Sequence, residues 1–173
     1  ADAQPVRSAT VHQEGEFFLN GAWKPLEADQ FITTGRPAFM WDARIRLAPL
    51  LSVYVRDAYI AGHATMRARV AGLYPLIDAH NNAALDSAAL MRYLGEAVWL
   101  PTRLRPGHGI TWAAVDDTRA DVTLVDNGTS VTLRFTFAAN GDVAQIDSDG
   151  RFRELNGRYV RTPWRVQIGR AHV

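Results

Sequence analysis

Three residues in the segment 90–104, LMRYLGEAVWLPTRL, have the types and the spacing for ligand binding or proton transfer. Arg92, Glu96 and Trp99 follow one another at i, i+4 and i+7, so in a helix they share one face. The guanidinium could hold a carboxylate or phosphate of a ligand, and the carboxylate could act as a base. The alternative is an ordinary ion pair on a helix surface, which is the more common arrangement of such residues.

A second group of charged and aromatic residues lies upstream. Its members are Trp41, Asp42, Arg56, Asp57 and Tyr59. Because neighbouring side chains of a strand point to opposite faces, either Arg56 or Asp57 must face the core, and a charge there requires a partner. Arg92 or Glu96 would be such a partner. A network of this kind more often stabilises a fold than performs catalysis.

The composition excludes several classes of protein and site. The chain has 173 residues, 19 of them basic and 18 acidic, with no basic run that would attract nucleic acid or an anionic lipid surface. The absence of cysteine excludes disulfides, zinc–thiolate sites and thiol nucleophiles. The histidines lack metal-ligand spacing, the serines lack a nucleophile elbow, and there is no glycine-rich phosphate loop. We therefore expect no metal, no cofactor and no nucleic-acid partner.

Turn signals and alternation predict antiparallel hairpins on both sides of the helix. Asn20-Gly21, Asn127-Gly128 and Asn140-Gly141 are residue pairs that type I′ hairpin turns favour. The last two pairs join three runs into a β-meander, at 121–125, 130–137 and 142–146. Upstream, alternation of apolar and polar residues predicts three further strands, at 39–47, 53–60 and 63–70.

The helix has predicted boundaries at both ends. Asp86 or Ser87 can cap its free amide groups. Pro101 ends it, because the residue before a proline avoids helical backbone angles. The segment 72–85, which precedes the helix, is predicted to be irregular, with one helical turn at most.

These elements predict a mainly β, α+β fold. We expect a strongly curved antiparallel sheet or half-barrel of meander hairpins with one main helix packed in its concavity, because helix and sheet each have an apolar face to bury. Residues 1–167 are expected to form a single domain that is truncated at its C-terminus. The last six residues, IGRAHV at 168–173, resemble a translated sequencing adapter and are expected to be non-native.

Three segments, PAFMWDARIRLAP (37–49), VRDAYIAGHATM (55–66) and MRYLGEAVWLPTRL (91–104), resemble an uncharacterised bacterial family, a domain of unknown function. The resemblance covers nearly the whole chain and implies no activity. It marks as motif positions Trp41, Asp42, Arg56, Asp57, Tyr59, Arg92, Tyr93, Glu96, Trp99 and Pro101. The order of strands and helix is also loosely similar to the half-barrels of periplasmic lipoprotein carriers, although a fold alone does not fix a function.

Three functions are compatible with these residues. The first is non-enzymatic binding of an apolar small molecule or lipid chain between sheet and helix, by Trp41, Asp42, Arg56, Asp57, Tyr59, Arg92, Tyr93, Glu96 and Trp99. The second is a structural or interaction domain whose charged network only fixes the helix. The third is a hydrolase- or isomerase-type enzyme that uses Glu96 and Asp57 with Arg92. No stretch approaches the roughly 20 apolar residues of a transmembrane helix, and the compartment, cytoplasmic or envelope, stays open.

Overall fold

The computed structural model describes residues 6–169, and the chain divides into two compact units, residues 1–82 and 83–173. Each unit is described by itself. Of the tail expected to be non-native, only Ile168 and Gly169 fall within the described residues. The single domain expected over residues 1–167 stays a prediction.

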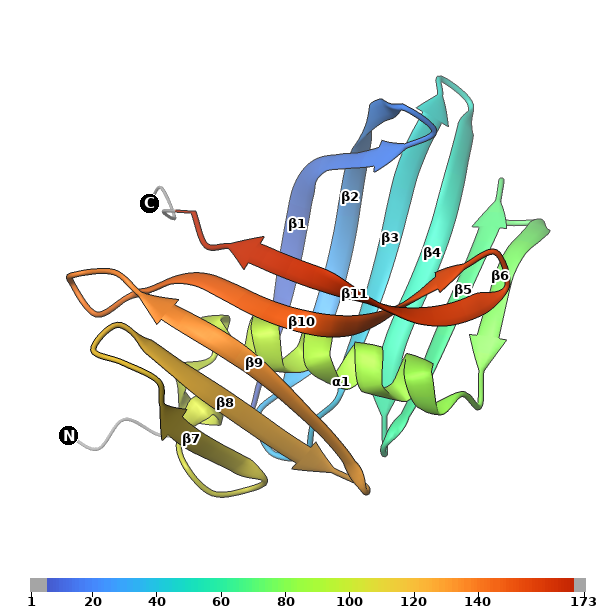
Figure 1. The fold of residues 1–173 in the computed structure, drawn as a ribbon. Coiled ribbons are helices and arrows are strands. Elements are labelled where there is room, and N and C mark those ends of the chain that lie inside the picture. Colours follow the sequence, from blue (N-terminus) through green and yellow to red (C-terminus); the bar gives the residue numbers. More distant parts are fainter. Residues whose placement is uncertain (1–5, 170–173) are drawn as a thin grey trace. The chain divides into compact units, whose positions relative to one another are not determined.

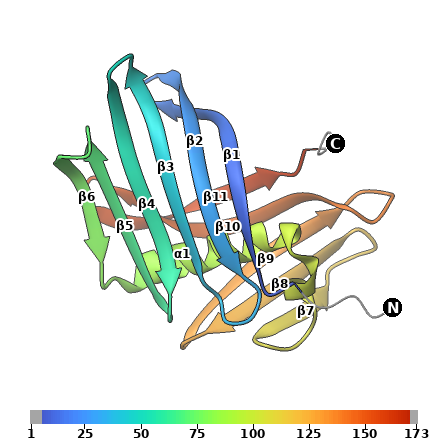
Figure 2. The ribbon, with the colours of Figure 1, turned by 180° about the vertical axis from the view of Figure 1, so that it is seen from behind.

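The first unit is a six-stranded antiparallel sheet in which each strand pairs with the next in the sequence. The strands lie side by side in this order when seen from the front (Figure 1) and from behind (Figure 2). They are β1 (Ser8–Leu19), β2 (Ala22–Thr33), β3 (Phe39–Ala48), β4 (Leu51–Ile60), β5 (His63–Val70) and β6 (Tyr74–His80).

Two-residue turns set the register of this sheet. Asn20 and Gly21 both have positive φ, 51° and 80°, as a type I′ turn requires, and they bring Leu19 opposite Ala22. Ala61 and Gly62 join β4 to β5 with similar angles, 54° and 90°. The hairpins predicted for this part of the chain are therefore confirmed.

Alternation gives the sheet an apolar face and a charged face. On β3, Phe39, Ala43 and Ile45 are buried, whereas Arg44 and Arg46, in the alternate positions, are exposed. Residues directly opposite one another on paired strands share a face, so the buried positions join into one apolar cluster. Its members are Ala28, Ala43, Ile45, Val53, Val55 and Ala68, with the partly buried Leu26, Trp41, Leu47, Met66 and Val70 packed against them.

The second unit combines a five-stranded antiparallel sheet with the α-helix (Figure 1). The helix α1 (Ala83–Glu96) is followed by two 3₁₀ turns, η1 (Ala97–Trp99) and η2 (Pro101–Leu104). The strands are β7 (Ile110–Ala114), β8 (Arg119–Asp126), β9 (Thr129–Phe137), β10 (Val143–Leu155) and β11 (Arg158–Gln167), which lie in the order β11-β10-β9-β8-β7.

The helix packs its apolar side on this second sheet. It contacts β8, β9 and β10, and Leu90 and Leu94 are fully buried, as expected for the apolar face of the helix. Gly95 permits a close approach, because a Cβ atom there would lie 3.0 Å from the Trp164 ring of β11. The apolar stripe of α1 therefore covers the apolar side of its own sheet, and this burial stabilises both elements.

The mainly β class with one main helix is confirmed. Strands on the two sides of α1 form two separate antiparallel sheets. Within residues 6–169, both strand orders are open, and no pairing closes either sheet into a barrel.

The segment before the helix was predicted wrongly. It is not irregular, because Tyr74–His80 forms β6 and pairs with β5. The predicted cap is also wrong, since α1 begins at Ala83 and contains both Asp86 and Ser87. Asn82, which directly precedes the helix, is of a residue type that N-caps favour.

The helix end follows the prediction in part. Leu100, the residue before Pro101, leaves the helical region with φ −127° and ψ 68°, as the steric effect of proline requires. The α-helical hydrogen bonding nevertheless ends earlier, at Glu96, and the next turn tightens into η1.

The meander of β8, β9 and β10 is confirmed, but its two turns differ. Asn127 and Gly128 have φ of 45° and 79°, as predicted for type I′. At the second turn, only Gly141 has a positive φ, 87°, so type I′ geometry is wrong there. Asn156-Gly157, a fourth pair that the prediction overlooked, turns β10 into β11 with φ of 53° and 78°.

Candidate functional site

One row of side chains on the apolar face of the first sheet contains polar groups. Gln30, Trp41, Asp57 and Met66 lie directly opposite one another on β2 to β5. Gln30 is fully buried, whereas Trp41, Asp57 and Met66 are partly buried. We call these four residues the Trp41 row.

Hydrogen bonds connect the Trp41 row to β1. The Trp41 indole Nε1 donates to Gln13 Oε1 at 2.9 Å, and Gln13 Nε2 donates to Gln30 Oε1 at 2.9 Å. The buried Gln30 amide therefore has an acceptor interaction that offsets its desolvation. This chain of bonds fixes the plane of the indole across three strands.

The rows on both sides of the Trp41 row are apolar. Toward one end of the strands lie Ala28, Ala43, Val55 and Ala68, and toward the other end lie Ile32, Phe39, Tyr59 and Ala64. The first of these rows consists of small side chains, and all four are buried. The apolar face therefore has one row with polar groups, the Trp41 row, between two apolar rows.

Sequence reasoning missed Gln13 and Gln30. A signal was present, because Gln30 occupies the apolar phase of the alternation Leu26, Ala28, Gln30, Ile32 on β2. A polar residue in that phase must be buried with a hydrogen-bond partner. The predicted site consists of charged and aromatic residues and therefore does not include these uncharged amides.

Either Arg56 or Asp57 was predicted to face the core. The residue that does so is Asp57, which lies on the same face as Val55 and Tyr59. Arg56 lies on the opposite, charged face, where it binds Asp42 through two hydrogen bonds of 2.6 and 2.9 Å. The hydrogen bond that Arg56 donates to Asp42 raises the pKa of Arg56. Asp42 and Arg56 are thus separated by the sheet from Trp41, Asp57 and Tyr59.

A row of ion pairs crosses the charged face. The row consists of His12, Asp29, Asp42, Arg56, Arg67 and Asp78, one residue from each strand. His12 Nδ1 lies 2.9 Å from Asp29 Oδ1, and this hydrogen bond raises the histidine pKa. All of these residues except Asp78 border a depression of about 610 Å³. Because the pairs are exposed, each stabilises the fold only slightly.

In the second unit, Arg92 and Glu96 form an ion pair on one face of α1. Arg92 Nε donates to Glu96 Oε1 at 2.8 Å, and the two side chains are 16% and 17% exposed. Trp99, the third member of the predicted face, is half-exposed on η1. It borders a groove of about 830 Å³ together with Val98, Ala138, Ala139, Asn140, Asp142, Val143, Ala144, Ile168 and Gly169.

Tyr93 is buried beside a cation that the sequence reasoning did not consider. Arg103 of η2 is almost fully buried, and its Nε donates to Tyr93 Oη at 3.0 Å. Its Nη2 also donates to the His108 carbonyl at 3.1 Å. Burial raises the pKa of Tyr93, although the adjacent guanidinium opposes this shift. Tyr93 and Arg103 thus form a structural contact between α1 and the turn before β7.

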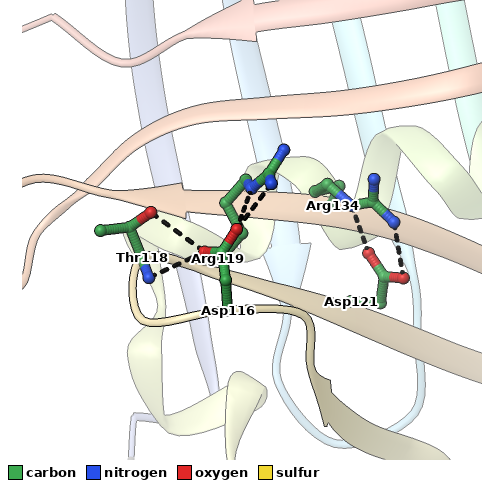
Figure 3. A network of polar contacts seen from close by, with 5 residues as sticks. All are labelled: Asp116, Thr118, Arg119, Asp121 and Arg134. Atoms are coloured by element: carbon green, nitrogen blue, oxygen red, sulfur yellow. Dashed lines mark hydrogen bonds and ion pairs between the residues drawn. The ribbon is translucent and has the colours of Figure 1, made fainter.

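The exposed face of the second sheet carries a row of alternating charges that sequence reasoning also missed. Asp121, Arg134, Asp147 and Arg165 lie opposite one another on β8 to β11. Arg134 donates to Asp121 at 2.8 and 3.0 Å (Figure 3), and Arg165 donates to Asp147 at 2.7 Å. A depression of about 630 Å³ lies over this row. The guanidinium of Arg134 lowers the pKa of Asp121.

The structure therefore groups the nine predicted ligand-binding residues into smaller sets. Trp41, Asp57 and Tyr59 share the apolar face of the first sheet, and Asp42 and Arg56 share the charged face. Arg92 and Glu96 are paired on α1, Tyr93 is buried with Arg103, and Trp99 borders the groove beside η1. Their roles in ligand binding stay predictions. Residues 6–169 contain no group of three or more acidic or histidine side chains that could hold a metal ion.

Comparison with known proteins gives a family without an activity. The model of a family of unknown function (DUF6920) matches residues 1–172. Neither the comparison with curated proteins nor the comparison with solved structures produced a match. In the part of the chain that the structure describes, the single α-helix is too short and too polar to cross a bilayer.

Proposed function

We propose that this chain, which belongs to the family of unknown function DUF6920, is a non-enzymatic module that binds an apolar small molecule or a lipid chain. The ligand would lie on the apolar face of the first sheet. The observation that carries this proposal is the Trp41 row, a row with polar groups that lies between apolar rows on the same face. Sites for apolar ligands typically combine such an apolar lining with a few fixed polar groups.

The row of small side chains would supply the floor for the apolar part of the ligand. Ala28, Ala43 and Ala68 are opposite or nearly opposite one another across β2 to β5. The partly buried Leu26, Met66 and Val70 pack around them and would form the edge at which a ligand enters. Each methylene that leaves water on such a surface contributes about 0.8 kcal/mol to binding.

The Trp41 row would recognise the polar end of the ligand. Trp41 and Gln13 are held in place by the hydrogen bonds that lead to Gln30, so they lose little conformational freedom on binding. Asp57 adds a carboxylate at the same level. A hydroxyl or amide group would find both donors and acceptors there.

Two methionines offer a matched test. Met66 lies on the apolar face and Met40 lies on the charged face, so Met66→Gln and Met40→Gln make the same chemical change on opposite sides of the sheet. We expect the intact protein to retain a lipid in native mass spectrometry and to bind a fluorescent fatty acid saturably. Met66→Gln should weaken that binding about tenfold, and Met40→Gln should leave it unchanged.

Two results would refute the proposal. One is a protein that retains no lipid and shows no saturable probe binding. The other is an equal effect of the two glutamine variants, which would mean that the probe does not distinguish the apolar face. Thermal unfolding of both variants gives the necessary control, because a partly unfolded Met66→Gln protein would lose binding for another reason.

A further inference from the structure

Exposed apolar side chains gather at one end of the first sheet. In this antiparallel order, the β1–β2, β3–β4 and β5–β6 turns all lie at the same end of the strands. Each of these turns carries large apolar residues that are exposed, namely Phe18, Trp23, Leu50, Leu51, Leu73 and Tyr74. We call these six residues the tip patch.

The most exposed side chains of the tip patch contribute little to the stability of the fold. Leu50 is 100% exposed, Leu73 77%, Tyr74 71% and Trp23 63%, so these side chains bury little area within the chain. The Phe18 and Trp23 rings contact each other edge to face, with centroids 5.3 Å apart. A group of exposed apolar side chains of this size is typical of a surface that binds another molecule or a membrane.

The turns at the opposite end of the sheet differ in composition. The β2–β3 connection contains Thr34, Gly35 and Arg36, and Thr33 Oγ1 donates to the Arg36 carbonyl at 2.6 Å. The β4–β5 turn is the small pair Ala61-Gly62. Exposed large apolar residues near this end are fewer, namely Phe31, Met40 and Ile60, and the most exposed ones of the sheet, Leu50, Leu73, Tyr74 and Trp23, all belong to the tip patch.

Cations lie directly behind the tip patch. Each of the three hairpins has one basic residue within three positions of its turn: Lys24, Arg46 and Arg69. Glu16 is the acidic residue at a similar depth, and Arg46 lies 3.6 Å from the half-exposed Glu27. Although the net charge of the whole chain is only +1, the charge next to the patch is locally positive.

From this arrangement we infer that the tip patch docks on the surface of a phospholipid bilayer. Tryptophan, tyrosine and phenylalanine prefer the interface between headgroups and acyl chains. Leucine side chains on narrow, projecting turns can enter the apolar boundary while the strands behind them stay in water. Basic residues behind them meet the headgroup phosphates, and each contributes to binding when anionic lipid is present.

This inference does not depend on the proposed ligand site, because none of the six tip residues belongs to the Trp41 row. A flotation experiment with the full chain separates the two. Vesicles of phosphatidylcholine, and vesicles of phosphatidylcholine with phosphatidylglycerol in equal parts, are mixed with the protein and centrifuged through a density gradient. We expect the protein to float with both kinds, and to float more fully with the anionic vesicles.

Variants test the residues. The double change Leu50→Asp and Leu73→Asp should reduce the fraction bound about tenfold or more, without an effect on the melting temperature or on binding of the fluorescent fatty acid. Ile60→Asp, at the other end of the sheet and 57% exposed, is the matched control and should float like the wild type. Lys24→Gln with Arg69→Gln should weaken binding only to anionic vesicles, and added salt should have the same effect.

The inference is overturned if the wild-type protein stays in solution with both kinds of vesicle, or if the double aspartate variant floats as the wild type does. A second copy of the chain is the other possible occupant of the patch. Sedimentation that shows a wild-type dimer, a monomeric double variant and no flotation would assign the patch to that copy and reject the bilayer.

Discussion

At the scale of single residues, the strongest electrostatic effect is at Asp116, in the turn between β7 and β8. Its carboxylate accepts hydrogen bonds from Arg119 Nε at 2.7 Å and from the Thr118 backbone N–H at 2.9 Å (Figure 3). These donors, Arg119 first, lower the pKa of Asp116 from 3.8 to about 2. We expect a carboxyl titration followed by NMR to show a midpoint near that value.

The consequence for stability has a definite sign. A carboxyl group whose pKa is depressed in the folded state stabilises the fold above its unfolded pKa, and this contribution is lost as the pH falls through the folded value. Here the loss falls between the ordinary pKa of 3.8 and about 2. Arg119→Gln should return the midpoint toward 3.8, and Arg105→Gln, the same change elsewhere, should not. An unshifted midpoint in the wild-type protein would contradict the geometry of the turn.

The residue scale also shows what sequence reasoning can and cannot find in a candidate site. Alternation along β4 showed that Arg56 and Asp57 face opposite sides, but it did not show which of them faces the core. That choice depends on the register of β4 against β3, which pairs Asp42 with Arg56 on the charged face. Gln13 and Gln30 were missed because the two amides are far apart in the sequence and become neighbours only through the register of β1 against β2.

At the scale of elements, two of the three predicted type I′ turns are confirmed, because their causes are local. Asn-Gly pairs favour the positive φ angles of a type I′ turn in any fold, and Asn20-Gly21 and Asn127-Gly128 have those angles. β6 was missed for a physical reason. Pro75 and the exposed Leu76 and Ile77 do not give the pattern of a half-buried strand, but an edge strand tolerates proline and is held by pairing on one side.

The start of α1 was missed because several residues suit a cap. Asp86 and Ser87 are both favoured N-cap types, and only tertiary packing shows that the helix includes them. Ala88, Ala89 and Leu85 are buried, so the first turns of α1 contribute to the core. Packing of this kind contributes more to helix stability than the choice of cap.

Substitution of the Arg92–Glu96 pair of α1 distinguishes a structural from a catalytic role of these two residues. The pair is short, 2.8 Å, and both side chains are mostly covered. Glu96→Gln should therefore lower the free energy of unfolding by about 0.5–1 kcal/mol, measured by urea denaturation. Glu16→Gln, on an exposed site of β1, should change it by less.

Binding of the fluorescent fatty acid should be the same in both glutamine variants. A Glu96→Gln protein that keeps its full stability would show that the ion pair has no structural role. In that case a catalytic role for Glu96, with Arg92, becomes the stronger interpretation and would be tested against hydrolase substrates.

At the scale of the whole molecule, charge is abundant but nearly balanced. The chain has 19 basic and 18 acidic residues, and both sheets arrange many of them as ion pairs on one face. Balanced pairs leave little net field to keep molecules apart. The tip patch adds exposed apolar area, through which copies of the chain can attract one another. Electrostatic repulsion between the copies is weak, because the charge is balanced.

This balance predicts an unusual dependence of self-association on pH. Above pH 7 few side chains titrate before pH 10, because the chain has one lysine, Lys24, and no cysteine. Toward acid pH the chain takes up protons, so its net charge rises above +1. Static light scattering should therefore show the strongest self-association over a broad range from about pH 7 to 9.5, and a steep decrease in acid. Leu50→Ser, which leaves the charge unchanged, should reduce scattering across that range, whereas scattering that is independent of pH would show that net charge does not control association.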